Sequence, residues 1–166
     1  MVMAYALIEA NENYRKIWLY DTFSGMTRPT EEDRSIPDGK SAINRWGKNG
    51  FGNWESPSLE EVRRNILSTG YPKKNFIFIK GDVQETIPKS RPSKISLLRL
   101  DTDWYRSTRD ELLYLYPILV KHGVLIIDDY VYWMGTKKAV DEYFSERAIL
   151  LNRIDRTSRI AIKIAN

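Results

Sequence analysis

The sequence predicts an α/β fold built on a mostly parallel sheet. Short runs of apolar and β-branched residues alternate with longer segments of helical periodicity, which is typical of βαβ units rather than hairpins. Acidic residues directly follow two of the apolar runs. With 166 residues and 42% hydrophobic content, the chain is long enough to bury one core, so we expect a single domain over residues 1–166.

The strand predictions rest on the apolar runs. Ile95–Leu100 and Val124–Ile127 are nearly continuous in apolar residues, as expected for central strands covered on both faces. Ile149–Ile154 and Arg159–Ile164 alternate and are joined by a short connection, which predicts an antiparallel edge pair at the C-terminus. Further strands are expected at Lys16–Tyr20 and Asn75–Lys80.

Helices are expected between these strands. Ser58 and Glu61 have the spacing of a capping box, which predicts a helix that begins at Leu59 and stops at Gly70. A second helix is expected over about 107–120, where Pro117 would kink or shorten it. Two more are expected over 4–12 and 136–144.

A long segment at about 25–57 has no regular periodicity and is rich in glycine and proline. Long irregular connections in compact domains are usually functional or disordered, so we expect a lid or insertion here. The apolar residues Trp46, Phe51 and Trp54 favour a folded flap. A partly disordered surface insertion is the alternative.

The composition excludes several classes of protein. The sequence has no cysteine, which rules out disulfides and thiolate metal ligands. The net charge is +4, but the basic residues are interspersed with acidic ones, so we expect no nucleic-acid partner. No apolar run is long enough for a membrane helix and no export signal is visible, so we expect a cytoplasmic protein without a membrane partner.

Four carboxylates stand just past two neighbouring predicted strands. Asp101 and Asp103 follow the first, and Asp128 and Asp129 follow the second. Ligands bind outside the carboxyl ends of parallel strands, and clustered acids need raised pKa values or a cation between them. A hard divalent metal such as Mg²⁺ would satisfy them. The alternative is ordinary helix capping and a polar strand end.

Other residues could bind ligands. Asp21 follows Lys16–Tyr20 at a place where an acid in such a sheet commonly accepts hydrogen bonds from a ribose diol. Gly81 and Asp82 end the next strand, where an adenine would lie; a plain turn is the alternative at both places. Aromatic residues are concentrated near the acids, which favours a sugar- or ring-binding wall, although core packing would explain some of them: Trp104, Tyr105, Tyr130, Tyr132 and Trp133.

Four motifs are specific in combination: YDTFSGM, GDVQETIP, LDTDWYRSTRDELLYLYPIL and GVLIIDDYVYWMGTKKAVDEYF. Together they resemble the macrocin O-methyltransferase family, which methylates sugar hydroxyls on antibiotics. The resemblance implies a Rossmann-like methyltransferase sheet with an antiparallel C-terminal edge strand, and dependence on S-adenosylmethionine and Mg²⁺. It implies Asp101, Asp128 and Asp129 as metal ligands and Asp103 as general base. The cofactor-binding residues it implies are Asp21, Thr22, Phe23, Gly81, Asp82 and Asp101.

The sequence departs from the family pattern at its start. Family members have a first strand and a glycine-rich turn that cradle the methionine end of the cofactor, and no such turn precedes Ala4. We expect an N-terminally abbreviated sheet: either the chain is a fragment or shortened product, or the sheet closes up without its usual central strand. Exposed strand edges would favour a homo-oligomer.

The expected function is O-methyl transfer to a small-molecule acceptor with a vicinal diol. Two alternatives are open. One is a catalytically impaired, methyltransferase-like fragment that binds ligand or metal. The other is a glycosyltransferase that would use Asp101 and Asp103 as its DxD motif.

Overall fold

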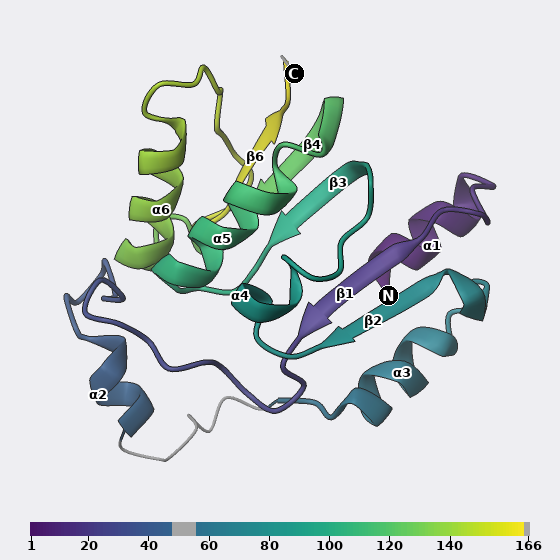
Figure 1. Ribbon diagram of the computed structural model, residues 1–166, viewed down its shortest axis with the longest axis horizontal. Coiled ribbons are helices and arrows are strands. Elements are labelled where there is room, and N and C mark those ends of the chain that lie inside the picture. The colour runs from purple at the N-terminus through teal and green to yellow at the C-terminus, as the bar shows by residue number, and fades with distance from the viewer. Residues whose placement is uncertain (48–55, 165–166) are drawn as a thin grey trace.

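The computed structural model describes residues 1–47 and 56–164 of the chain (Figure 1). Helices and strands alternate along most of it, as the sequence predicts. In chain order the elements are α1 (Val2–Glu9), β1 (Ile17–Asp21), α2 (Ala42–Gly47), α3 (Leu59–Leu67), a 3₁₀ turn (Lys73–Asn75), β2 (Phe76–Lys80), α4 (Val83–Thr86), β3 (Ile95–Leu100), α5 (Tyr105–Leu115), β4 (Leu119–Ile127), α6 (Met134–Phe144), β5 (Asn152–Arg153) and β6 (Arg159–Ile162).

The strands form two separately hydrogen-bonded sheets. β1 and β2 pair in parallel, and the second sheet has the order β3-β4-β6-β5. In that sheet β3 and β4 are parallel, whereas β6 is antiparallel to both β4 and β5. The antiparallel C-terminal edge is thereby confirmed. Figure 1 shows β1 and β3 running in the same direction, but no pairing joins them within the described residues, so the expectation of a closed-up sheet is wrong.

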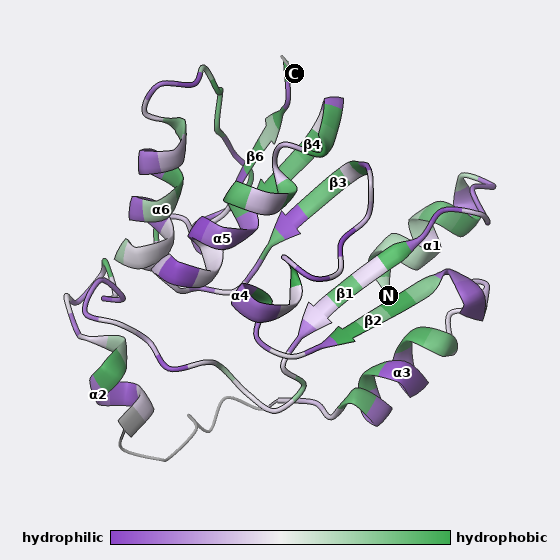
Figure 2. Ribbon diagram, in the orientation of Figure 1, coloured by the Kyte–Doolittle hydropathy of each residue, from purple (hydrophilic) through white to green (hydrophobic). Residues whose placement is uncertain are grey.

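Each sheet has its own hydrophobic cluster. The larger cluster lies between β3, β4 and β6 and the helices α4, α5 and α6, with Leu112, Ile127 and Val140 fully buried. The smaller one joins α1 and α3 to β1 and β2 around Tyr71 and Phe76. Figure 2 shows apolar residues along most of β2, β3 and β4, and a mixture of apolar and polar residues on α3, α5 and α6. None of the helices in the described part of the chain is long and apolar enough to cross a membrane.

The helix after β3 ends before residue 120, as expected if Pro117 shortens it. It ends at Leu115, and Leu119 already belongs to β4. Pro117 explains the early end, because proline cannot continue the hydrogen-bond ladder of a helix. The buried ammonium group of Lys163 donates to the carbonyls of Tyr116, Pro117 and Leu119 at 3.1, 3.2 and 2.7 Å, so the side chain that directly follows β6 satisfies the backbone beyond the helix.

Two strand predictions also need correction. β3 is covered on one face only: Leu98 and Leu100 are buried, whereas Leu97 is 42% exposed on the other face. The predicted strand over Ile149–Ile154 is reduced to the pair Asn152–Arg153. Only these two residues pair with β6, so the apolar run from Ile149 to Ile154 predicted an edge strand that is too long.

Candidate active site

The strands β3 and β4 end in acidic residues, which the fold brings to one edge of the larger sheet. Asp101 directly follows β3, and Asp128 and Asp129 directly follow β4. The N–H of Asp128 donates a 2.9 Å hydrogen bond to the carbonyl of Leu100, so the strand pairing continues into the acidic ends. The carboxyl ends of parallel strands are where ligands bind in open α/β sheets.

Asp103 lies in a strained turn beside these acids. Its φ is +64°, and the N–H of Trp104 donates a 2.8 Å hydrogen bond to the carbonyl of Thr102 across it, the pattern of a γ-turn. Asp129 also has a positive φ, of +49°. Such backbone at a residue other than glycine is strained by about 1–3 kcal/mol and is often found at functional sites.

The acids perturb one another electrostatically. Burial raises the pKa of Asp103 to about 7; repulsion from the three neighbouring carboxylates adds to this shift, and a hydrogen bond from Trp133 opposes it. Desolvation raises the pKa of Asp101 to about 6, although Arg99 lowers it and 45% of the side chain is exposed. Desolvation and the charge of Asp128 also raise the pKa of Asp129. Perturbed carboxyls in one place are typical of functional sites.

Arg99 supplies a counter-charge that the sequence analysis missed. Its Nη1 lies 2.7 Å from Asp101 Oδ2, and its Nη2 contacts Asp128 Oδ2. Burial alone would raise the pKa of Asp128, but the hydrogen bond from Ser158 and the charge of Arg99 leave it below the usual range. Side chains two apart on a strand share a face, so the spacing of Arg99 and Asp101 could have revealed the pair.

The predicted metal ligands Asp101, Asp128 and Asp129 offer carboxylate oxygens, the donors that Mg²⁺ prefers. Desolvation, together with repulsion from neighbouring carboxylates, raises the pKa values of Asp101 and Asp129, whereas the pKa of Asp128 is lowered. Across residues 1–47 and 56–164, however, no three acidic side chains are arranged as a metal site. The donor atoms thus suit Mg²⁺ in their chemistry but are not arranged as a formed site, and Arg99 would have to leave Asp101 and Asp128 for the ion to bind.

The predicted cofactor residues of β1 lie in a compact turn at the end of that strand. The Oδ1 of Asp21 accepts a 2.8 Å hydrogen bond from the N–H of Phe23 and lies 3.4 Å from the hydroxyl of Thr22. The ring of Phe23 is only 6% exposed, and its φ is +52°. The Asp21 side chain is exposed, and the ends of β1 and β3 point to the same side of the molecule (Figure 1).

The end of β2 lies against the end of β1. The N–H of Gly81 donates a 3.0 Å hydrogen bond to the carbonyl of Asp21. Gly81 has φ +139°, which side-chain-bearing residues rarely adopt. Asp82 caps α4 by accepting a 2.9 Å hydrogen bond from the N–H of Gln84. The ends of β1 and β2 are thus joined, and the cofactor roles of their residues stay predictions.

The described part of segment 25–57 is attached to the acidic end of the larger sheet. The carboxylate of Asp33, which is fully buried, accepts hydrogen bonds of 2.6 Å from the N–H of Thr30 and 2.8 Å from the N–H of Tyr105 at the start of α5. A Cβ on Gly135 would lie 2.0 Å from the same carboxylate, so only glycine fits there. Asp33 therefore fastens this segment to α5 and α6.

Two tryptophans near the acids are buried and pack against this segment. Trp104 and Trp133 are 2% and 3% exposed and meet edge to face at 5.1 Å. The indole N–H of Trp104 donates a 2.8 Å hydrogen bond to the carbonyl of Thr27. Core packing therefore explains these two residues better than the ring-binding wall that we considered. The expected anchors Phe51 and Trp54 lie outside the described residues.

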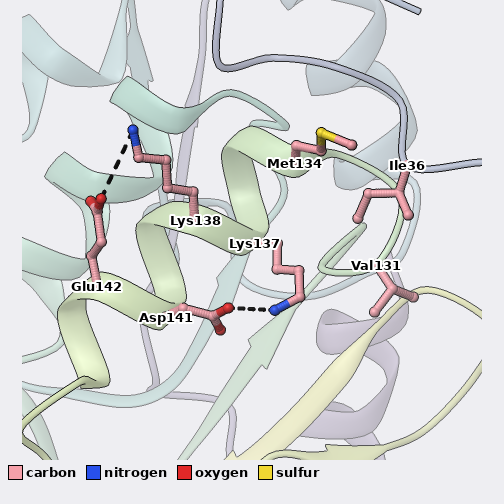
Figure 3. A pocket seen from close by; sticks show the side chains of 7 residues that line it. All are labelled: Ile36, Val131, Met134, Lys137, Lys138, Asp141 and Glu142. Atoms are coloured by element: carbon pink, nitrogen blue, oxygen red, sulfur yellow. Dashed lines mark hydrogen bonds and ion pairs between the residues drawn. The ribbon is translucent and has the colours of Figure 1, made fainter. Parts of the chain in front are cut away.

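A shallow hollow lies beside α6, where Ile36 meets the helix (Figure 3). Its floor is apolar, and its two lysines are paired with carboxylates on the same helix, Lys137 with Asp141 and Lys138 with Glu142. None of the predicted site residues lines it. The hollow is therefore not the site indicated by the sequence.

The chain was compared with known proteins. The model of the family described as Macrocin-O-methyltransferase (TylF) matches residues 1–161. The chain is 36% identical to demethyldecarbamoylnovobiocin O-methyltransferase of Streptomyces niveus over 129 residues, which are 78% of this chain and 47% of that protein. It is 32% identical over 116 residues to a Streptomyces olivaceus protein named 8-demethyl-8-(2,3-dimethoxy-alpha-L-rhamnosyl)-tetracenomycin-C 4'-O-methyltransferase, covering 70% of this chain and 42% of that one.

A solved structure is also similar. The O-methyltransferase NovP superimposes with a TM-score of 0.82 and 29% identity, covering 98% of this chain and 66% of that chain. The chain therefore spans less than half the length of the two relatives above and about two thirds of the NovP chain. These matches favour the methyltransferase interpretation over the glycosyltransferase one.

Proposed function

This chain belongs to the macrocin O-methyltransferase family, and we propose that it takes part in methyl transfer from S-adenosylmethionine to a hydroxyl group of a sugar or small natural product. The observation that carries the proposal is the gathering of four carboxylates at the ends of β3 and β4, one of them with a pKa near neutrality. The relatives named above support the class of acceptor, since both are O-methyltransferases of natural products and one name specifies a rhamnosyl group.

Asp103 is the proposed general base. A base works best when its pKa lies near the working pH, and the pKa of Asp103 is raised to about 7. Asp103 would accept the proton of the acceptor hydroxyl while the oxygen takes the methyl group. Its γ-turn and the hydrogen bond from Trp133 hold the carboxylate in one direction.

Asp101, Asp128 and Asp129 are the proposed ligands of Mg²⁺. When bound, the ion would lower the pKa of a hydroxyl in a vicinal diol and orient the acceptor. Ser158 would hold the Oδ1 of Asp128, through its 2.7 Å hydrogen bond, while the other oxygen faces the ion.

S-adenosylmethionine would supply a methyl group on a positively charged sulfur. The proposed contacts of this chain are to the adenosine side, with Asp21 at the ribose and Gly81 and Asp82 near the adenine. Thr22 and Phe23 shape the turn that presents Asp21. Asp101 belongs to both proposed sets of residues, so it would contact the cofactor and the metal ion. Segment 25–57 is proposed as a lid over this edge, attached through Asp33.

The test is calorimetric titration of the purified chain with Mg²⁺ and, separately, with S-adenosylmethionine. We expect both to bind, and we expect Asp128→Ala to lose the metal while keeping the cofactor. Metal binding without cofactor binding would instead support the alternative of a catalytically impaired metal-binding chain. Binding of neither would contradict the proposal.

The proposed role of Asp103 as general base is tested by replacing its carboxylate with an amide. Asp103→Asn removes the base but keeps the size of the side chain, so we expect Mg²⁺ to bind as in the wild type. Where the wild type transfers methyl groups, the variant should lose about 100-fold or more of the turnover. Unchanged turnover would remove Asp103 from the mechanism.

A further inference from the structure

A buried acid beneath the acidic cluster has no place in the mechanism so far. Glu111 on α5 is only 5% exposed, and its burial raises its pKa to about 8. A carboxyl group inside a core is unfavourable unless it is hydrogen-bonded, and an apolar side chain would be better tolerated there. Its presence therefore needs a reason in its contacts.

Glu111 contacts the loop that carries two of the predicted site residues. The hydroxyl of Thr102 donates a 3.0 Å hydrogen bond to Glu111 Oε2. The carbonyl of Thr102 accepts a 3.2 Å hydrogen bond from the hydroxyl of Ser107. Side chains from α5 thus hold both the side chain and the backbone of Thr102, which stands between Asp101 and Asp103.

The loop needs support from outside because its own conformation is unfavourable. Asp103 has φ +64° in the γ-turn that joins Trp104 to Thr102. Strained backbone persists only where the surrounding structure fixes it. The hydroxyl of Thr136 on α6 donates a 2.6 Å hydrogen bond to the carbonyl of Asp103, so Glu111, Ser107 and Thr136 hold the turn from two helices.

We propose that Glu111 is a positioning residue that sets the direction of Asp101 and Asp103 through its hydrogen bond to Thr102. The inference rests on the proposed function, because it assigns Glu111 to the support of that same metal and base site. Replacing a residue that orients metal ligands through hydrogen bonds typically weakens metal binding by about 10- to 100-fold.

The experiment compares four variants of the chain by calorimetry with Mg²⁺. Glu111→Gln keeps an acceptor for Thr102 and should bind Mg²⁺ within about threefold of the wild type. Glu111→Leu and Thr102→Val remove the two partners and should each weaken binding about 10-fold or more. The double variant should be no worse than either single one, because both remove the same hydrogen bond.

A second measurement tests the conformation of the loop in the absence of metal, by hydrogen exchange. The N–H of Trp104 is bonded to Thr102, so its hydrogen exchange should accelerate in Glu111→Leu and stay slow in Glu111→Gln. Asp110→Asn is the matched control: Asp110 is a neighbouring buried acid on α5 that pairs with Arg109 rather than with the loop. Asp110→Asn should lower the stability of the chain without changing the exchange of the Trp104 N–H relative to the amides of α5.

The outcomes separate the two proposals. Unchanged Mg²⁺ affinity and unchanged Trp104 exchange in a folded Glu111→Leu chain would overturn the role of Glu111 and leave the proposed function intact. If the wild type itself binds no Mg²⁺, the metal part of the proposed function fails, and Trp104 exchange alone decides whether Glu111 holds the loop.

Discussion

The two sheets carry their predicted functional residues in different ways. At the end of β1, the carboxylate of Asp21 is engaged by its own turn, through the N–H of Phe23. After β3, Asp103 is held by a hydrogen bond from α6, and its neighbour Thr102 by α5; burial, with a smaller effect of nearby acids, raises the pKa of Asp103. A site of the first kind is built from adjacent residues, whereas a site of the second kind exists only once distant elements have packed. The acidic site should therefore be the more sensitive one to changes in the core.

The largest expected effect is in the core of the larger sheet. Leu112 is fully buried between β3, β4 and the helices, and Leu112→Ala should lower the free energy of unfolding by about 2–5 kcal/mol. Denaturant unfolding measures the loss, and hydrogen exchange locates it. We expect β3 and β4 to lose protection while β1 and β2 keep theirs. Equal loss in both sheets would show that they unfold as one unit.

The next effect concerns pH. The pKa of Asp103 in the folded chain is about 7, above its ordinary value of 3.8, so the folded state binds this proton more tightly than the unfolded state. The stability from that proton is present below about pH 4 and is lost as the pH rises through 7. Between pH 5 and 8, Asp103 should lower the free energy of unfolding of the wild type by about 2 kcal/mol. Asp103→Asn should lack this part of the decrease.

The control is Asp155→Asn. Hydrogen bonds from the N–H groups of Ser158 and Thr157 lower the pKa of Asp155, so its contribution is lost only as the pH falls well below 5. In Asp155→Asn, the free energy of unfolding should change with pH between 5 and 8 as it does in the wild type. A wild-type stability that rises over this interval would contradict the raised pKa of Asp103.

A smaller effect is expected in the core of the β1–β2 sheet. The hydroxyl of Tyr71 lies 2.9 Å from the carbonyl of Glu12 and 2.6 Å from that of Arg15, tying the chain before β1 to that core. Tyr71→Phe should lower the free energy of unfolding by about 0.5–1.5 kcal/mol, because the two partly buried carbonyls lose their donor. Tyr5→Phe, at a residue that is 49% exposed, is the control. Faster exchange in β3 would contradict the independence of the two sheets.

The smallest effect on stability is expected at Arg99. Its ion pairs are partly exposed, so Arg99→Met should change the free energy of unfolding by less than about 1 kcal/mol. The affinity of the Arg99→Met variant for Mg²⁺ should rise severalfold, because no guanidinium group is then paired with Asp101 and Asp128. Arg99→Lys keeps the charge and should stay near the wild type. Equal affinity in all three would show that Arg99 does not compete with the ion.

Much of the fold could be predicted because its signals are local. The capping box of Ser58 and Glu61 is present in full, and β1, β2 and β3 lie within one residue of their predicted bounds. The early end of α5 follows from Pro117, which the sequence shows. The short β5 was misjudged, because its pairing with β6 is not a local signal.

The candidate site was only partly predictable for the same reason. Strand order brings the acids together, and alternation along a strand could have added Arg99. Glu111 has no such signal, because its partner Thr102 is defined by the packing of α5 under the acidic loop. Backbone strain at Asp103 and Asp129 is likewise visible only in three dimensions.

The division into two sheets also bears on the order in which the chain folds. β3 and β4 pair across a single short helix, whereas β1 meets β2 only after the chain has closed around the whole of segment 25–57. Contacts between residues close in sequence form faster, because less chain entropy is lost before they are made. The acidic cluster should therefore assemble early, and the turn of Asp21 should reach its place beside Gly81 in a later step.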